Sequence, residues 1–378
     1  MLSSTTSYGL LFFGLFMSTV LATPSYIKYE SVSGYFLQDL DSTNDTTFNF
    51  MTTNFGLRNR TYTSSSSSTD GTTENQTQWE RFAKHVWQLN EESDYGVEYK
   101  VLFIGRHGEG YHNTAESYYG TPAWNCYYSQ MDGNDTITWA DAQLTPKGIA
   151  QAQAVNAFWA KQITEQSIPT PQKFYTSPLS RCCATAALTF TGLTLQASQP
   201  FIPQVKELLR EWISGHTCDR RSNMSYIAAN YPTFTFEEGF QEVDPLWNAT
   251  FVETTSAQNE RSRSVLDDIF MNDPSTYISI TTHSGEAASI LSGLFTVELL
   301  LCEDEFADSG VVLGHRPFSL STGAVIPILV RAETVTGRPP FPTRQPWTVI
   351  STCATPPPSP TPTTDDIERS AARMMRIQ

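Results

Sequence analysis

An apolar run at Tyr99–Gly105 constrains the fold more than any other part of the sequence. Apart from Lys100, the run consists of apolar residues and a glycine, without a polar residue at every second position. A strand of this kind is buried on both faces, as in largely parallel sheets that helices cover on each side. Arg106 and His107 follow at once, so two side chains that can carry positive charge stand where the strand is expected to end.

Strand-like and helix-like segments alternate over residues 95–335. The stretch 144–163 opens with Thr145 as a helix N-cap and Pro146 at the first helical position, which proline favours. Further strands are expected at 173–177, 276–284 and 323–333, and further helices from about 179 and over 285–295. This alternation predicts an α/β fold, a three-layer α/β/α sandwich with a largely parallel central sheet.

Residues 1–22 are predicted to be a signal peptide. Gly9–Val20 is apolar but short for a membrane span, and Val20 and Ala22 suit the cleavage site of a signal peptidase. The alternative is a disordered apolar N-terminus. Because no second apolar run is long enough to hold the mature chain in a membrane, we expect a secreted or secretory-pathway protein without an anchor.

Polar extensions flank the predicted α/β domain. Residues 23–94 form a Ser/Thr-rich N-terminal extension, and its part up to about residue 78 is predicted to be a flexible linker. One packing helix is expected at its end, where apolar residues recur at helical spacing: Trp79, Phe82, Val86 and Leu89. Residues 336–378 form a C-terminal extension with a proline-rich tail that cannot build a core.

Six N-x-[ST] sequons favour the secretory route, and N-linked glycans are predicted at Asn44, Asn59, Asn75, Asn134, Asn223 and Asn248. The chain also has six cysteines, some of which we expect to form disulfides in an oxidising compartment. Six cysteines allow 15 pairings, and the sequence does not choose among them. None shows the C-x-x-C spacing typical of metal sites, and no metal site is predicted.

The formal net charge of −15 argues against binding to nucleic acid or to an anionic membrane. A phosphate-binding protein with this charge needs a local cationic pocket. The ends of three predicted strands offer one, with Arg106 and His107 after the first, Arg181 after the second and His283 after the third. Since the carboxyl ends of parallel strands meet at one crevice, these side chains can form a site for a phosphate dianion.

An imidazole among cations is expected to stay neutral, and therefore nucleophilic, near neutral pH or below it. Its attack on phosphorus would give a phosphohistidine, and a carboxyl group must protonate the leaving oxygen. Glu207 and Glu211, in a stretch rich in charged residues, are the candidates for this acid. Arg220 and Arg221 can either clamp a second anionic group of the substrate or form a solvated face.

Five ordered motifs carry a family resemblance: RHGEGYHN, LTPKGIAQA, TSPLSR, LLRE and TTHSG. Their order resembles the histidine phosphatase superfamily, in its phosphoglycerate-mutase-like branch and closest to fungal members, over residues 95–333. The resemblance implies that His107 is the phosphoacceptor and Glu211 the proton donor, with Glu207 as the fallback. The residues that it implies for substrate binding are Arg106, Arg181, His283 and Asn113. It implies no metal and no organic cofactor.

The phytase-like branch of the same superfamily fits less well, because it has an aspartate where this chain has Ser284 after His283. The other histidines of this region are interpreted as structural or surface residues: His112, His216 and His315. The aromatic-rich segment 113–144 is interpreted as a loop that packs by its own rings, with a substrate-contacting lid as the alternative.

These features predict a secreted phosphatase that hydrolyses small phosphate monoesters through a phosphohistidine intermediate. One alternative is a phosphoglycerate-type mutase, which returns the phosphoryl group to another hydroxyl. Another is a phosphatase specialised for one metabolite phosphate or diphosphate. A non-catalytic binder of phosphorylated ligands is least favoured, because binding alone needs no proton donor.

Overall fold

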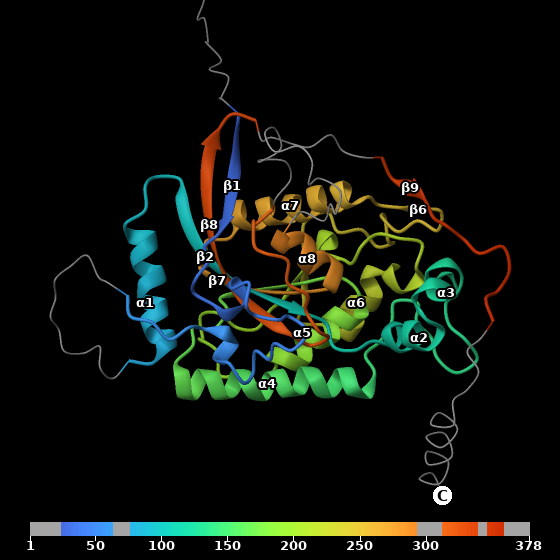
Figure 1. The fold of residues 1–378 in the computed structure, drawn as a ribbon, viewed down its shortest axis with the longest axis horizontal. Helices are drawn as coiled ribbons and strands as arrows, with labels where there is room; N and C mark the ends of the chain where they lie inside the picture. Colours follow the sequence, from blue (N-terminus) through green and yellow to red (C-terminus); the bar gives the residue numbers. More distant parts are fainter. Residues whose placement is uncertain (1–23, 63–75, 293–311, 339–345, 359–378) are drawn as a thin grey trace, which may run out of the picture.

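The computed structural model of the protein describes residues 24–62, 76–292, 312–338 and 346–358. Its central sheet has seven strands in the order β1-β8-β2-β7-β3-β4-β5 (Figure 1). The strands are β1 (Ser25–Ser31), β2 (Val97–Arg106), β3 (Lys173–Thr176), β4 (Gln204–Val205), β5 (Thr235–Phe236), β7 (Tyr277–Thr282) and β8 (Val325–Thr336). A two-stranded sheet pairs β6 (Phe251–Val252) with β9 (Thr348–Val349).

The predicted largely parallel sheet is confirmed. β2, β7, β3, β4 and β5 run parallel to one another, and β8 is antiparallel to both of its neighbours, β1 and β2. In the register of the sheet, Arg106 at the end of β2 lies opposite Thr282 at the end of β7. Thr176 at the end of β3 lies opposite Thr281. The three strand exits that carry the candidate residues therefore share one edge of the sheet.

β2 shows why helices cover both faces of the sheet. Leu102 and Ile104 belong to one apolar core, whereas Val101 and Phe103 belong to another. Successive side chains of a strand point to opposite faces, so each core lies on its own side of the sheet. The first core includes residues of α7 (Thr255–Asn272) and α8 (Ser284–Ser292), and the second includes residues of α1 (Gln78–Glu91) and α4 (Pro146–Gln166). Figure 1 shows the sheet between these groups, which confirms the three-layer sandwich.

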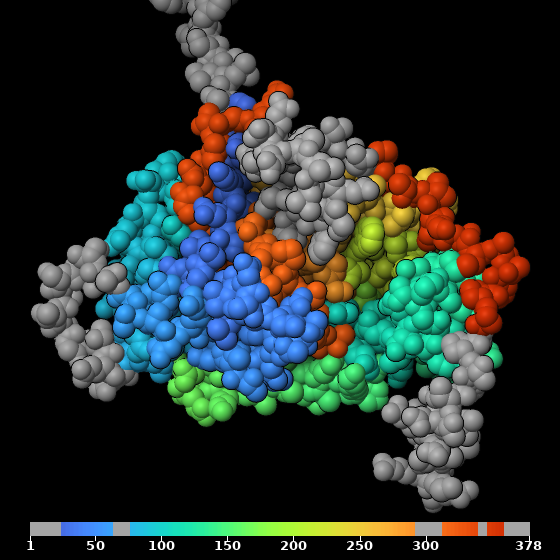
Figure 2. All heavy atoms as spheres, in the orientation of Figure 1, coloured from blue at the N-terminus to red at the C-terminus, as the bar shows by residue number. Residues whose placement is uncertain are grey.

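The N-terminal extension differs from the predicted flexible linker. Over 24–62 it contributes β1, which pairs along its whole length with β8, and it buries Phe36, Phe50 and Phe55 in the core beside α1 and α4. In Figure 2 the extension, coloured blue, covers part of the visible face next to α4. The linker prediction is wrong there because a few spaced aromatics in a polar segment suffice to dock it. The predicted packing helix is α1, and the domain boundaries at 22, 94 and 335 stay predictions.

A disulfide between Cys126 and Cys353 ties the C-terminal extension to α3 (Thr121–Cys126). The backbone N–H of Cys353 also donates to the carbonyl oxygen of Cys126 at 2.9 Å. Three further cysteines are buried and free: Cys182, Cys183 and Cys218. This resolves one of the pairings that the sequence left open. Cys302, the signal peptide, the Asn75 sequon and the tail beyond residue 358 lie outside the described residues.

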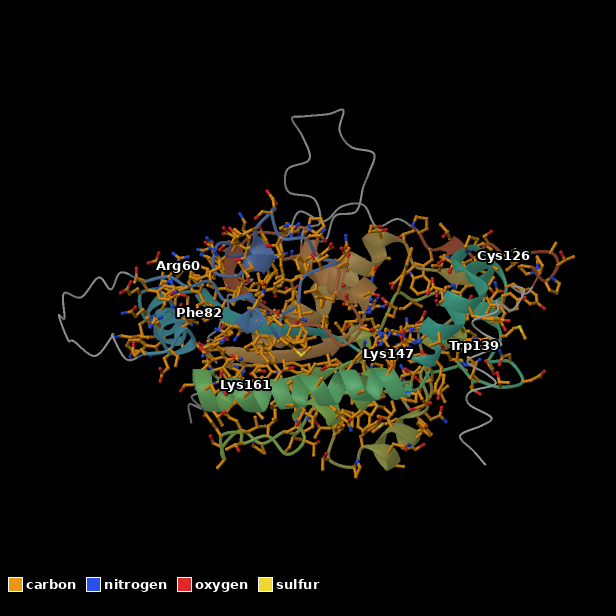
Figure 3. The ribbon with its side chains drawn as sticks, turned by 60° about the horizontal axis from the view of Figure 1, so that its bottom comes forward. Arg60, Phe82, Cys126, Trp139, Lys147 and Lys161 are labelled. Carbon is orange, nitrogen blue, oxygen red and sulfur yellow. A yellow bond between two sulfur atoms is a disulfide. The ribbon has the colours of Figure 1, made fainter. Side chains whose placement is uncertain are left out.

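The segment 113–144 packs by its own rings, as interpreted from the sequence. Trp124, Tyr128 and Trp139 are buried in a small cluster of their own, and the rings of Tyr119 and Tyr128 stack at 3.6 Å between centroids. Figure 3 shows Trp139 and Cys126 at the same end of the molecule. The lid interpretation remains a hypothesis. Within the described ranges, no helix has the length and apolar character needed to cross a bilayer.

Candidate active site

The sheet brings the two predicted histidines together. His107 follows β2 and His283 follows β7, and these strands are neighbours. The backbone N–H of His107 donates to the carbonyl oxygen of Thr282 at 2.9 Å, and the two imidazole rings lie 5.0 Å apart between centroids. Arg181 enters from α5 (Ser180–Phe190), after β3, and its Nε–H donates to Nδ1 of His283 at 3.3 Å. Residues more than a hundred positions apart along the chain thus form one cluster.

The hydrogen bonds of His107 determine which ring nitrogen can attack. Nδ1 lies 2.7 Å from the carbonyl oxygen of Gly108, which can only accept, so Nδ1 carries the proton and Nε2 keeps its lone pair. Burial, followed by the charges of Arg181 and Arg106, holds the pKa of His107 well below its usual value. The ring therefore stays neutral and nucleophilic.

Gly108 lets the exit of β2 meet the start of α4. A Cβ atom at this position would lie 2.5 Å from the carbonyl oxygen of Gly148, closer than real Cβ contacts allow. The peptide N–H of Gly108 donates to Oγ1 of Thr185 on α5 at 3.0 Å. The glycine after His107 thus permits a close backbone contact that fixes the loop carrying His107 between two helices.

Two guanidinium groups flank the histidines. Nη1 of Arg106 donates to the carbonyl oxygen of Leu320 at 2.8 Å, whereas its Nε is buried without a hydrogen-bond partner. Arg181 is fully buried, and Nη2 donates to Oδ1 of Asp219 at 2.9 Å. Burial lowers the pKa of Arg181, but the surrounding charges, of which the Asp219 carboxylate is the strongest, together outweigh burial and raise that pKa. Both arginines are therefore charged cations beside His107.

His283 is neutral in this arrangement. Because Arg181 donates to Nδ1, the proton of the ring is on Nε2, which donates to Oγ of Ser177 at 2.7 Å. Burial and then the charge of Arg181 keep the pKa of His283 well below its usual value. Ser177 directly follows β3 and belongs to the TSPLSR motif, so this motif supplies both the arginine and the hydroxyl that orient the ring.

The side chain of Glu211 lies against the start of α8, the helix that directly follows His283. Its Oε2 accepts from Oγ of Ser284 and from the N–H of Gly285, both at 3.3 Å, and its Oε1 accepts from the N–H of Glu286 at 3.2 Å. The N-terminus of a helix offers free N–H groups to such a carboxylate. A Cβ atom on Gly285 would come within 2.4 Å of Oε1, so glycine is required for this approach.

Glu207, the fallback acid, lies in a different environment. Its two carboxylate oxygens accept from Nε of Arg221 at 3.1 and 2.9 Å, and Nη1 of Arg210 donates to it at 3.1 Å. All three side chains are buried. Burial raises the pKa of Glu207, and the two cations offset only part of that shift. Its carboxylate oxygens are nevertheless taken up by guanidinium donors, whereas those of Glu211 contact the residues that directly follow His283. The geometry therefore favours Glu211 over Glu207.

The remaining predicted substrate contacts have partners within the chain. Oδ1 of Asn113 accepts from the N–H of Gly110 at 2.9 Å and so caps the start of α2 (Tyr111–Tyr119). Nη2 of Arg220 is paired with Asp132 at 2.7 Å. Arg221 is buried in its ion pair, and four backbone carbonyls accept its remaining N–H groups. These contacts do not support a substrate-binding role for Arg221, and that prediction is withdrawn.

The structure adds a residue that sequence reasoning missed. His112 was interpreted as structural or surface, yet it is buried and its ring lies 5.3 Å from that of His107 between centroids. Burial and then Arg181 lower its pKa well below the usual value. The sequence signal for this position is that a helix, α2, begins soon after β2 ends. The turn between them brings His112 back beside His107. His216 and His315 make other contacts, with Trp124 and with the carbonyl oxygen of Arg316.

One cluster has the residue types of a metal site. In the part of the chain that the structure describes, His216, Cys218 and Asp219 bring three ligand atoms within 4.8 Å of one another. Asp219 already binds the cation of Arg181, and burial raises the pKa of the Cys218 thiol, which opposes the thiolate that a metal needs. The cluster therefore does not favour a cation, and the absence of a metal cofactor stays a prediction.

Comparisons with known proteins agree with the motif order. The sequence model of the histidine phosphatase superfamily (branch 1) matches residues 128–304, a range that holds Arg181, Glu211 and His283 but begins after His107. "Probable phosphoglycerate mutase" of Arthroderma benhamiae is 46% identical over 316 residues, which cover 83% of this chain and 87% of that protein. "Phosphomutase-like protein 3" of Candida albicans is 33% identical over 263 residues, 69% of this chain and 74% of that protein.

The first of these relatives is similar along most of both chains, so the similarity extends beyond single motifs. The central sheet has the predicted parallel order, and its shared edge carries the motif residues. The chain therefore belongs to the histidine phosphatase superfamily, in its phosphoglycerate-mutase-like branch.

Proposed function

We propose that the protein is a phosphatase that hydrolyses small phosphate monoesters through a phosphohistidine on His107. The observation that carries this proposal is the unprotonated Nε2 of a buried imidazole beside two arginines. The carboxylate of Glu211 at the neighbouring strand exit supports it, because binding alone needs no proton donor. Arg106 and Arg181 supply the positive charge that a transferring phosphoryl group requires.

The proposed reaction has two displacements. In the first, the Nε2 lone pair of His107 forms the N–P bond while the ester P–O bond breaks, and Glu211 gives its proton to the leaving oxygen. In the second, water attacks phosphorus as the N–P bond breaks, and Glu211 takes the proton of that water. Nε–H of Arg181, which His283 accepts here, would turn to a phosphoryl oxygen. Apart from the substrate and one water molecule, these steps use only groups of the chain itself.

The relative from Arthroderma benhamiae, named for a mutase, favours a second candidate, a phosphoglycerate-type mutase. Such an enzyme must hold the carboxylate of its substrate with a cation. The two arginines considered for this task are already paired, Arg220 with Asp132 and Arg221 with Glu207. The negative charge of Glu116, which acts on Arg106, would repel a second carboxylate. We therefore place the phosphatase first.

A panel of phosphate esters tests the proposal with the purified protein. We expect inorganic phosphate from p-nitrophenyl phosphate and from several sugar phosphates, and no 2-phosphoglycerate from 3-phosphoglycerate. Isomerisation of phosphoglycerate without phosphate release would establish the mutase instead. A preference of at least about a hundredfold for one ester or diphosphate, about 2.7 kcal/mol, would establish a specialised phosphatase. Binding of the esters without turnover would leave only the non-catalytic binder.

The depressed pKa of His107 predicts activity in acid. Protonation would remove the nucleophile, and burial with Arg181 and Arg106 moves that protonation well below its usual pH. We expect kcat/KM, corrected for ionisation of the ester, not to fall between pH 6.5 and 5.5. A histidine with an ordinary pKa of about 6.5 would lose about fivefold over this range. A pH profile with p-nitrophenyl phosphate measures this, and an acid limb centred near pH 6.5 would contradict it.

We also propose that the protein is exported and N-glycosylated. The disulfide between Cys126 and Cys353 is typical of an oxidising compartment. Five of the six predicted acceptors lie in the described ranges, and all five are exposed: Asn44, Asn59, Asn134, Asn223 and Asn248. Treatment of the protein from its native culture medium with an N-glycosidase should lower its mass, and an unchanged mass would contradict glycosylation.

A further inference from the structure

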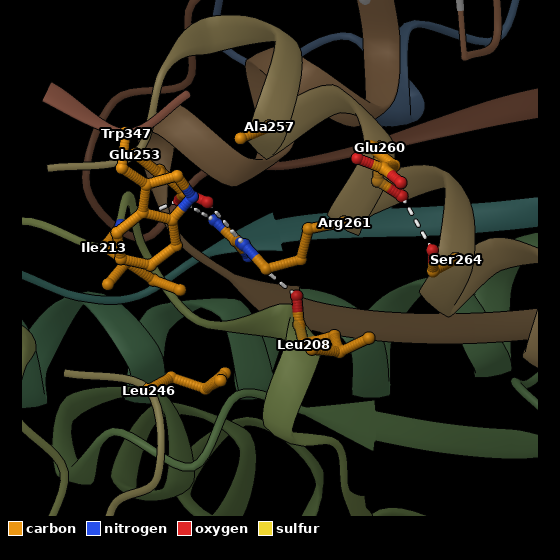
Figure 4. Close-up of a pocket in the computed structure, with 9 residues that line it drawn as sticks. All are labelled: Leu208, Ile213, Leu246, Glu253, Ala257, Glu260, Arg261, Ser264 and Trp347. Carbon is orange, nitrogen blue, oxygen red and sulfur yellow. Dashed lines mark hydrogen bonds and ion pairs between the residues drawn. The ribbon is translucent and has the colours of Figure 1, made fainter. Parts of the chain in front are cut away.

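A buried arginine outside the proposed reaction holds the backbone that carries Glu211. Arg261 lies on α7 and is only 8% exposed. Its Nη1 donates to the carbonyl oxygen of Leu208 at 2.8 Å and to that of Arg210 at 2.9 Å, and Nη2 donates to that of Glu211 at 3.3 Å. Figure 4 shows the contact with Leu208. One rigid guanidinium thus bonds three carbonyls of the LLRE motif.

Two buried carboxylates fix Arg261 in turn. Glu253 accepts from Nη2 at 2.5 Å and from Nε at 3.2 Å, and Oε2 of Glu286 accepts from Nη1 at 2.9 Å. Glu286 belongs to α8, and its own N–H donates to Oε1 of Glu211. Glu211 is therefore held at both ends, with its backbone bound to Arg261 and its carboxylate bound to α8. Glu286 joins the two supports.

This arrangement is more than fold stability requires. A buried arginine with two buried carboxylates often contributes no more stability than well-packed apolar side chains would, because removing the charges from water is costly. All three carbonyl contacts of Arg261 fall on the four residues that end in Glu211. A displacement of about 1 Å of a catalytic group can cost about a hundredfold in rate. Accurate placement of Glu211 accounts for where these contacts fall.

We propose that Arg261 is a positioning residue that aims the carboxyl group of Glu211 at the leaving oxygen of the substrate. The inference rests on the proposed phosphatase function and names the part of the chain that sets its proton donor. It predicts that loss of Arg261 weakens proton donation while the binding of the phosphoryl group by Arg106 and Arg181 stays intact.

A pocket beside this network makes the test practicable. Its volume is about 230 Å³, and Arg261 lines it together with Leu208, Ile213 and Glu253 (Figure 4). A shorter side chain at position 261 would let water from this pocket reach the carboxylates of Glu253 and Glu286. Water would then hydrogen-bond these carboxylates, which would otherwise be buried without a partner. Arg261→Gln is therefore a usable variant, and Arg261→Lys keeps the charge while it cannot reach all three carbonyls at once.

The experiment compares kcat/KM for two esters, because this constant reports formation of the phosphohistidine. p-Nitrophenyl phosphate has an acidic leaving group that needs little proton donation, whereas an alkyl phosphate needs full donation. For Arg261→Gln we expect a loss of about 30- to 100-fold with the alkyl ester and at most about threefold with the nitrophenyl ester. The inhibition constant of inorganic phosphate should change by at most about threefold. Arg261→Lys should recover part of the alkyl rate.

Arg263→Gln is the matched control, because Arg263 lies on the same helix but contacts Ile27 of β1. It should leave the ratio of the two rates unchanged. Equal losses with both esters in folded Arg261→Gln, or no loss with the alkyl ester, would overturn the inference. If Arg261→Gln does not fold, Arg261→Lys decides by the same ratio. A wild-type protein that releases no phosphate from either ester would refute the proposed function itself, which separates the two failures.

Discussion

Replacing His107 with alanine is expected to abolish phosphate release, with a loss of at least about a thousandfold in kcat. The ring supplies the only bond that holds phosphorus between the two displacements, and His112 and His283 lack its place at the exit of β2. Denaturing the wild-type protein at alkaline pH during turnover of a labelled ester should trap a phosphoenzyme that is stable in base and labile in acid. The variant should trap none.

His112→Gln is the control for this experiment. The substitution removes a neighbouring imidazole of similar burial, so it perturbs packing around His107 without removing the proposed nucleophile. We expect a smaller loss of kcat, on the order of tenfold, and a phosphoenzyme that still forms. Full activity of His107→Ala, or label that stays in it while His112→Gln loses it, would assign the nucleophile to another residue.

Glu211→Gln is expected to lower kcat/KM for alkyl phosphates by about a hundredfold to ten thousandfold, the usual contribution of a general acid. The glutamine keeps the size of the side chain and one oxygen that can accept from α8, but its amide cannot act as the acid. The effect on p-nitrophenyl phosphate should be smaller, because that leaving group departs without help. Steady-state kinetics with both esters measure the difference.

Glu207→Gln tests whether Glu207, and not Glu211, is the general acid. Breaking a buried ion pair by removing one partner costs about 3–5 kcal/mol, so this variant should unfold at a lower denaturant concentration. The folded protein should keep kcat within about tenfold of the wild type, with no dependence on the leaving group. A selective loss with alkyl esters in Glu207→Gln, and none in Glu211→Gln, would reverse the assignment of the acid.

Part of the fold and of the site could be predicted because local chemistry determines it. A strand of consecutive apolar residues must be covered on both faces, and the exits of neighbouring parallel strands must meet. These rules alone place Arg106, His107, Arg181 and His283 together. Other features depended on distant contacts. β1 pairs with a strand some 300 positions later, and Cys126 pairs with Cys353 across 227 positions. The sequence around β1 or Cys126 therefore does not indicate the partner.

The sequence by itself determined which residue types stand at the strand exits, because strand periodicity and the glycines around His107 are local properties. Only the tertiary structure decided what those residues can do. It distinguished Glu211 from Glu207, only four positions away in the sequence, by burying Arg221 against Glu207. It set the proton of His107 on Nδ1, and it bonded Arg261 to the backbone of Glu211. Protonation and aim depend on burial and on partners that the chain supplies from other elements, and the linear pattern does not contain these contacts.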